Sequence, residues 1–166
     1  MADKNFDVYF DCGSSKIRAC AFNKNDHKKI FYDTSKFFLE HSKIDHEIQK
    51  IISSIEKKTK EYLDEINLMI DSSKMLSVGI SISKKLEGLN LKKEDIKFLT
   101  QEAKQQVLRS NSNQQIVHII IKKYKIDDFD YIFFPKDTKC NLLSLDILFI
   151  CLPKKEIEYF KRLFFQ

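Results

Sequence analysis

Alternating hydrophobic and polar positions near the start of the chain predict two short β-strands. The alternating positions are Phe6, Val8, Phe10 and Cys12 in the first strand, and Ile17, Ala19 and Ala21 in the second. A spacing of two residues is typical of strands that bury one face. We therefore expect a hairpin over residues 6–23 with its turn at Gly13-Ser14-Ser15.

The hydrophobic spacing next predicts a strand, a helix and a short strand. Residues 28–40 are aromatic and favour a third strand. Apolar residues then recur at steps of three and four from Ile48 through Tyr62 to Ile66, which predicts an amphipathic helix. The apolar segment INLMID, residues 66–71, predicts a short strand after it.

The second half of the chain repeats this mixture. Residues 75–86 predict a strand, and Asn90 is a candidate N-cap for a helix. One face of that helix carries Ile96, Leu99, Ala103 and Val107. Residues 115–127 and 141–152 predict two further strands joined by an irregular segment, and a last helix covers residues 154–165. This order predicts an α/β or α+β fold with mixed sheets.

Composition narrows the class of protein. The 166 residues are 43% hydrophobic, which is sufficient for one domain or two small ones with packed cores. The net charge of +5 comes from interspersed charges, so we expect a solvated surface and no nucleic-acid partner. The polar N-terminus, the short apolar runs and the absence of a C-x-x-C pair favour a soluble intracellular chain with reduced thiols.

Known catalytic and nucleotide-binding motifs are largely absent. The chain has no P-loop sequence, and its glycines at 13, 79 and 88 do not form a dinucleotide-binding loop. The four histidines lack partners at the spacing of metal ligands. We expect no catalytic residue.

The opening hairpin is the remaining candidate site. A Gly-Ser-Ser turn presents backbone N–H groups and hydroxyls that can hold a phosphate. Asp11, which the sequence presents as an unpaired carboxylate, is positioned to hold Mg²⁺ through its waters, and Lys16 adds positive charge. From the residues alone, an ordinary turn beside an exposed acid is the favoured interpretation, because the pattern is short and has many chance matches.

Two resemblances favour the binding interpretation. The segment FDVYFDCGSSKIRACAFN resembles the first phosphate-binding hairpin of the actin-like ATPases. The segments LKKEDIKFLTQEAKQQV, IVHIIIKKYKID and LLSLDILFICLPKKEIEYF are similar, in that order, to the inserted subdomain of the bacterial cell-division protein family FtsA. The matching positions are Glu94, Asp95 and Ile96 at a helix start, and His118, Tyr124, Ile126 and Asp127 along the strand that follows.

The resemblance implies a fold with three parts. It is a partial actin-like, or ribonuclease H-like, subdomain with an inserted strand-helix-strand-strand module. Residues 1–71 would form the first part of the actin-like subdomain, residues 72–152 the inserted module, and residues 153–166 a helix that returns to the first part.

The resemblance also implies a ligand. Asp11, Gly13, Ser14, Ser15 and Lys16 match the first phosphate loop of the family, so they would bind ATP. Asp11 would act on the bound Mg²⁺ through water.

A role in cell division is implied as well. Complete members of the family bind ATP with weak or no hydrolysis, polymerise, link the filament protein FtsZ to the cytoplasmic membrane and recruit later division proteins. We therefore expect a cytoplasmic protein at the inner face of the membrane at the division site, with self-association through the inserted module. The membrane-binding C-terminal helix and the second lobe of the family have no place in residues 1–166, so we expect an N-terminal part or a short form, inactive alone.

The chain departs from the family in ways that leave alternatives open. Ile121, Lys122 and Lys123 stand where the family often has proline, glutamine and glutamate, and the loop before LLSLD lacks the usual glycines. The alternatives are another actin-like ATPase, of the pilus-assembly or chaperone type, or a stand-alone interaction module. In the latter, Asp11 is a surface acid without nucleotide chemistry.

Overall fold

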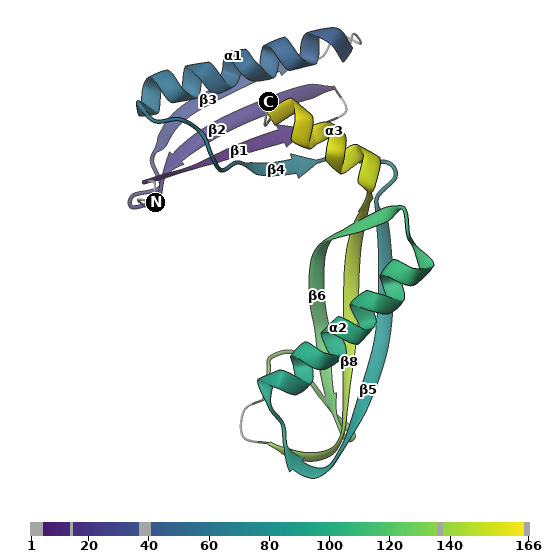
Figure 1. Ribbon diagram of the computed structural model, residues 1–166. Coiled ribbons are helices and arrows are strands. Elements are labelled where there is room, and N and C mark those ends of the chain that lie inside the picture. Colours follow the sequence, from purple (N-terminus) through teal and green to yellow (C-terminus); the bar gives the residue numbers. More distant parts are fainter. Residues whose placement is uncertain (1–4, 14, 37–40, 136–137, 165–166) are drawn as a thin grey trace. The chain divides into compact units, whose positions relative to one another are not determined.

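The computed structural model describes residues 5–13, 15–36, 41–135 and 138–164 and divides the chain into two compact units (Figure 1). The first unit comprises Met1–Ser73 with Tyr159–Gln166, and the second comprises Lys74–Glu158. The described residues form two four-stranded sheets and three helices. This confirms the predicted mixed class of α and β structure.

The first unit contains a sheet with the strand order β3-β2-β1-β4, and the helix α1 covers one face of it (Figure 1). Strand β1 pairs antiparallel with β2 and parallel with β4. The elements, in chain order, are β1 (Phe6–Cys12), β2 (Lys16–Asn23), β3 (Lys29–Lys36), α1 (His41–Thr59) and β4 (Asn67–Ile70).

The core of the first unit lies between this sheet and α1. The alternation seen in the sequence turns one face of β1 and β2 inward, and the isoleucines of α1 meet it. Phe10, Ile48 and Ile55 have no exposed surface. The ring of Phe10 contacts Phe164, at the end of helix α3 (Lys154–Phe164), with centroids 4.8 Å apart. Full burial of such side chains contributes roughly 1.5–3 kcal/mol each.

Helix α1 ends earlier than the sequence predicts. It stops at Thr59, and Lys60 has a left-handed backbone conformation with φ 60°. The Glu56 carboxylate accepts the N–H of Leu63, 2.9 Å away, which holds the chain after the turn. Tyr62 is therefore not part of the helical face and is 85% exposed. The predicted helical spacing up to residue 66 was wrong beyond the turn, although Leu63 still packs on the core.

The second unit contains an antiparallel sheet with the order β5-β8-β6-β7, and helix α2 lies across one face of it (Figure 1). Its core is formed by apolar side chains of α2 and of the sheet face beneath it. The elements are β5 (Leu76–Asn90), α2 (Lys93–Ser110), β6 (Gln114–Ile126), β7 (Phe129–Tyr131) and β8 (Lys139–Pro153).

Helix α2 confirms the predicted buried face but not its predicted cap. Leu99, Ala103 and Val107 are buried at steps of four residues. Asn90 is the last residue of β5, so it cannot cap the helix, and the N-cap is Lys92. The carboxylate of Asp95 accepts the backbone N–H of Lys92 at 3.0 Å and fulfils the capping function from inside the first turn.

The segment between the last two long strands is less irregular than expected. It contains the three-residue strand β7, which pairs with the end of β6. The third strand of the first unit is described from Lys29 to Lys36, and the rest of its predicted range, residues 37–40, lies outside the described residues. The other long strands and the last helix lie where the hydrophobic pattern predicts them.

Candidate functional site

The opening hairpin has the geometry that the alternation predicts. Strands β1 and β2 pair with Asp11 opposite Arg18 and Cys12 opposite Ile17. The N–H of Gly13 donates to the carbonyl oxygen of Lys16 at 3.1 Å, which closes the turn. The predicted turn therefore lies at the end of two paired strands.

Asp11 is paired, and the sequence interpretation of an unpaired carboxylate was wrong. Its Oδ2 lies 2.8 Å from a terminal guanidinium nitrogen of Arg18, directly across the hairpin. The Arg18 side chain is 45% exposed and that of Asp11 is 30% exposed, so water screens the pair. The observed pairing of Cys12 with Ile17 sets Arg18 opposite Asp11. A turn of residues 13–15 alone would have placed Ile17 there, so the predicted turn did not reveal this contact.

The other residues of the predicted phosphate loop lie close to Asp11 in the chain. Lys16 begins β2 and, by strand alternation, lies on the same side of the sheet as Arg18, away from the core. Ser15 is exposed, and Gly13 is half-buried. Ser14 lies outside the described residues. The structure brings the described members together at one end of the hairpin, and their role in binding phosphate stays a prediction.

Gly13 is not required by backbone strain. Its φ is outside the left-handed region, and a Cβ added there would meet the Lys16 carbonyl oxygen at 3.5 Å, an ordinary contact. A glycine at this position therefore leaves room for a ligand to approach the turn but is not needed for the turn to form.

The same face of the sheet carries a second acid with a cation across the strands. Asp7 lies four residues before Asp11 on β1, and its carboxylate is 3.5 Å from the Lys24 ammonium group. Asp7 also lines an open depression of about 430 Å³. Neither Asp11 nor a residue of the turn lines this depression. The lining residues are Asp7, Tyr9, Cys20, Phe22, Asn23, His27 and Met69. Asp7 therefore provides a natural comparison for Asp11.

In the second unit, one buried charge organises the start of α2. Asp95 is only 8% exposed, and its Oδ1 lies 2.6 Å from the Lys84 ammonium group on β5. The hydrogen bond from Lys84, together with the backbone N–H of Lys92, lowers the pKa of the Asp95 carboxyl below its usual value. The Lys84 ammonium group also lies 5.1 Å from the centroid of the Phe98 ring. These contacts connect β5 to the start of α2 and indicate a structural role for Asp95.

The face of the second sheet opposite α2 has a polar half. The ammonium group of Lys123 lies 3.1 Å from the Asp130 carboxylate and 3.6 Å from that of Asp146. The Ser81 hydroxyl donates to Asp146 at 2.6 Å, and this bond is the main reason why the pKa of Asp146 is lowered. Both acids therefore contact Lys123, a lysine of β6.

The described residues contain no group of three or more histidine, cysteine, aspartate or glutamate side chains placed to hold a metal ion. The four cysteines are free thiols, and only Cys20 is not buried. Burial raises the pKa of the Cys12 thiol to about 12, and the neighbouring Asp11 charge adds to the effect. No helix among the described residues has the length and apolar character needed to cross a membrane.

Comparison with protein families shows what the second unit is similar to. Residues 72–151 match the family model described as the SHS2 domain inserted in FTSA. The segment is similar to an SHS2 module of the FtsA type. This match supports an FtsA-like role in cell division and is compatible with interactions between division proteins. Comparison with curated proteins finds no match.

The second unit is inserted between two segments of the first unit. The first unit is built from residues before and after it, and the module begins on β5 and ends on β8, which are antiparallel neighbours. Leu76 pairs with Cys151, so the two crossing points lie on adjacent strands. The second unit thus interrupts the first, and its ends need not be far apart.

Proposed function

We propose that the chain is an FtsA-like cell-division protein whose complete form binds ATP with Mg²⁺, polymerises, links FtsZ to the cytoplasmic membrane and recruits later division proteins. The observation that carries this proposal is the match of residues 72–151 to the SHS2 domain inserted in FtsA. The interrupted first unit supports it, because a domain described as inserted needs a host on both sides. The protein would work in the cytoplasm, at the inner face of the membrane at the division site.

The proposed nucleotide site is the end of the β1–β2 hairpin. A phosphate would meet the backbone N–H groups of the turn, the hydroxyl of Ser15 and the ammonium group of Lys16. Asp11 would hold the Mg²⁺ ion through water. The ion pair with Arg18 supports this geometry, because a guanidinium group 2.8 Å away orients the carboxylate while leaving it 30% exposed.

Calorimetric titration with Mg-ATP tests the site in the full-length gene product. We expect Asp11→Ala to weaken binding by roughly tenfold or more, as loss of a group that positions the metal ion does. Asp7→Ala is the matched control, since Asp7 lies on the same strand and face and also pairs with a lysine. We expect its affinity to be unchanged.

The two variants also separate ligand binding from stability. Both acids form exposed ion pairs, so each substitution should change the free energy of unfolding by no more than about 1 kcal/mol. Equal Mg-ATP affinity for the wild type, Asp11→Ala and Asp7→Ala would exclude Asp11 from the site. A lack of Mg-ATP binding by the wild type would favour an interaction module without nucleotide chemistry.

A further inference from the structure

Strand β6 has an open edge in the second unit. Within the described residues, β8 pairs with one side of β6, and β7 pairs with the other side only from Tyr124 to Ile126. No described strand pairs with that outer side between Gln114 and Lys123. The backbone of this stretch is therefore available to hydrogen-bond to another strand.

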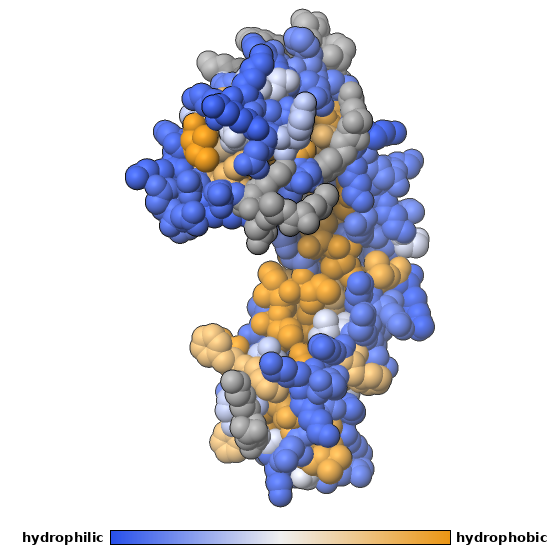
Figure 2. Space-filling model, turned by 60° about the vertical axis from the view of Figure 1, so that its left-hand side comes forward, coloured by the Kyte–Doolittle hydropathy of each residue, from blue (hydrophilic) through white to orange (hydrophobic). Residues whose placement is uncertain are grey.

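The open edge is also apolar. Val117, Ile119 and Ile120 are 36%, 40% and 47% exposed, and they follow one another closely on β6. Figure 2 shows hydrophobic side chains gathered on the face of the second unit that carries this strand. Exposed aliphatic side chains beside unpaired backbone groups are the features that a sheet uses when it accepts an added strand.

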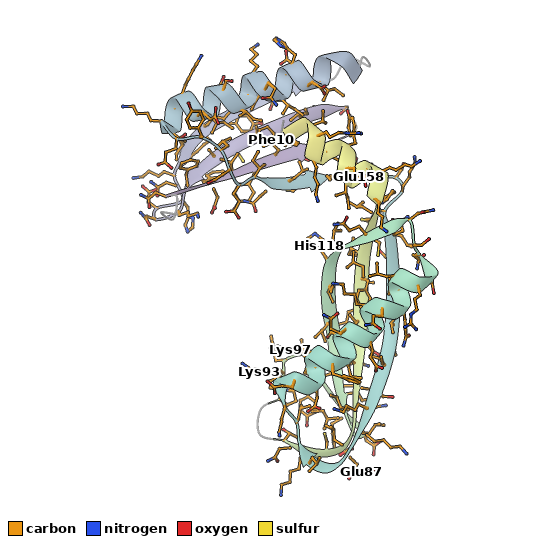
Figure 3. All side chains as sticks on the ribbon, in the orientation of Figure 1. Phe10, Glu87, Lys93, Lys97, His118 and Glu158 are labelled. Atoms are coloured by element: carbon orange, nitrogen blue, oxygen red, sulfur yellow. The ribbon has the colours of Figure 1, made fainter. Side chains whose placement is uncertain are left out.

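The register of β6 with β8 defines where on the open edge an added strand would pair regularly. The β6–β8 register shifts between Ile116 and His118 and again between Ile121 and Lys123, so the regular stretch between the two irregularities is His118–Ile121. Its side chains alternate between the two faces of the sheet. His118, labelled on β6 in Figure 3, pairs with Ile150, and Ile120 pairs with Leu148, so the face opposite α2 continues as an apolar surface.

The charge of β6 indicates what kind of segment fits. The strand contains His118 and three lysines, at 122, 123 and 125, but no carboxylate. The carboxylates of Asp130 and Asp146 are both held by Lys123. A second copy of this edge would bring the same lysines together, whereas an acidic segment would complement them.

We propose that the outer edge of β6, over residues 114–123, binds an extended segment of another protein that combines alternating apolar side chains with carboxylates near Lys122. The segment adds one strand to the sheet next to His118–Ile121. This inference deepens the interaction role proposed above and depends on it for the biological setting. It does not depend on the nucleotide site, so peptide binding is measured without ATP.

The probe is a fluorescent peptide of alternating valine and threonine with three glutamates at one end. Its counterpart carries three lysines in their place. We expect the complete chain to bind the acidic peptide at least roughly tenfold more tightly, with a preference that weakens at high salt. Fluorescence anisotropy measures affinity, and amide hydrogen exchange should show new protection at residues 118–121.

Substitutions locate the peptide. Ile119→Lys places a charge on the open edge and should reduce affinity for the acidic peptide by roughly tenfold or more, because the bound strand would then cover a lysine side chain. Phe133→Lys is the matched control, since Phe133 is 82% exposed and lies outside β6. Lys122→Glu should reverse the preference between the two peptides. Ile119→Thr keeps the test valid if thermal unfolding shows that Ile119→Lys is not folded.

Several results would overturn the proposal. They are equal affinity for the two peptides, protection away from β6, an equal loss of affinity in Ile119→Lys and Phe133→Lys, or no binding of either peptide. Self-association of the chain that Ile119→Lys abolishes would identify a second copy as the occupant and would equally contradict an acidic partner. Loss of Mg-ATP binding in Asp11→Ala would not change the measured peptide affinities. The nucleotide proposal and the peptide proposal can therefore be contradicted independently.

Discussion

Asp95 shows how one side chain can connect several elements. Its carboxylate accepts hydrogen bonds from the Lys84 ammonium group on β5 and from the backbone at the start of α2. Asp95 is 8% exposed, so little water reaches its carboxylate. If its charge is removed, its hydrogen-bond partners lose these bonds and water cannot fully replace them. Lys84 is 37% exposed, so solvent moderates the loss.

We expect Asp95→Asn to lower the free energy of unfolding by about 1–2 kcal/mol at pH 7. The pKa of Asp95 is lowered in the folded protein, so its charge stabilises the fold above the ordinary value of 3.8 and this contribution disappears as the pH falls through the folded pKa. The difference between wild type and variant should therefore be constant near neutral pH and shrink below about pH 4.

Urea denaturation followed by circular dichroism at several pH values measures this difference. Glu102→Gln, an exposed acid further along α2, serves as the control and should change the free energy of unfolding by less than about 0.5 kcal/mol. A difference for Asp95→Asn that stayed constant down to pH 2 would show that the charge of Asp95 does not carry the effect.

Entire helices and strands were the part of the structure that hydrophobic spacing predicted best. Burial on one face imposes a period of two or close to four residues, and β1, β2 and α2 follow it. The failures occur where a local contact competes with the period. Tyr62 continues the helical spacing, but the left-handed Lys60 has already ended α1. The short strand β7 has no period of its own and depends on pairing with β6.

Helix α2 should owe most of its stability to the buried face, with a smaller contribution from Asp95 at its start. Leu99 has no exposed surface and is the first apolar residue of the buried row. We expect Leu99→Ala to cost about 2–5 kcal/mol, because the removed methyl groups leave a cavity under the helix. Hydrogen exchange of the β8 amides measures the loss. Leu89→Ala, at a position 66% exposed on β5, should leave that exchange nearly unchanged. Similar losses in both variants would mean that α2 does not seal this core.

The candidate site was only partly predictable, because local spacing does not contain the register and order of the strands. The alternation fixes the hairpin, and the glycine and hydroxyl residues mark its turn, so the position of Asp11 follows from local sequence. Its partner Arg18 follows from the register, which a sequence gives only once the turn length is known. The open edge of β6 depends on the order of all four strands in the sheet, because pairing leaves one side of β6 free. No local pattern contains that order.

The arrangement of the chain as a host and an insertion leads to a final prediction. The two units have separate cores, and the apolar residues of β8 that fill the second core, such as Leu143, Leu145 and Phe149, have no exposed surface. The ends of the module are joined by the sheet itself, because β5 and β8 pair directly. A fragment spanning residues 74–158 should therefore fold alone, since closing its ends costs no additional loop entropy.

Nuclear magnetic resonance and urea denaturation test this fragment. We expect dispersed amide signals and one cooperative unfolding transition. The same fragment with Leu99→Ala should lose most of its stability, whereas Leu89→Ala should not, as in the complete chain. A fragment with collapsed amide dispersion and no cooperative transition would show that the module takes its stability from the host unit. In that case the pairing of β5 with β8 would not be sufficient for the module to fold without the first unit.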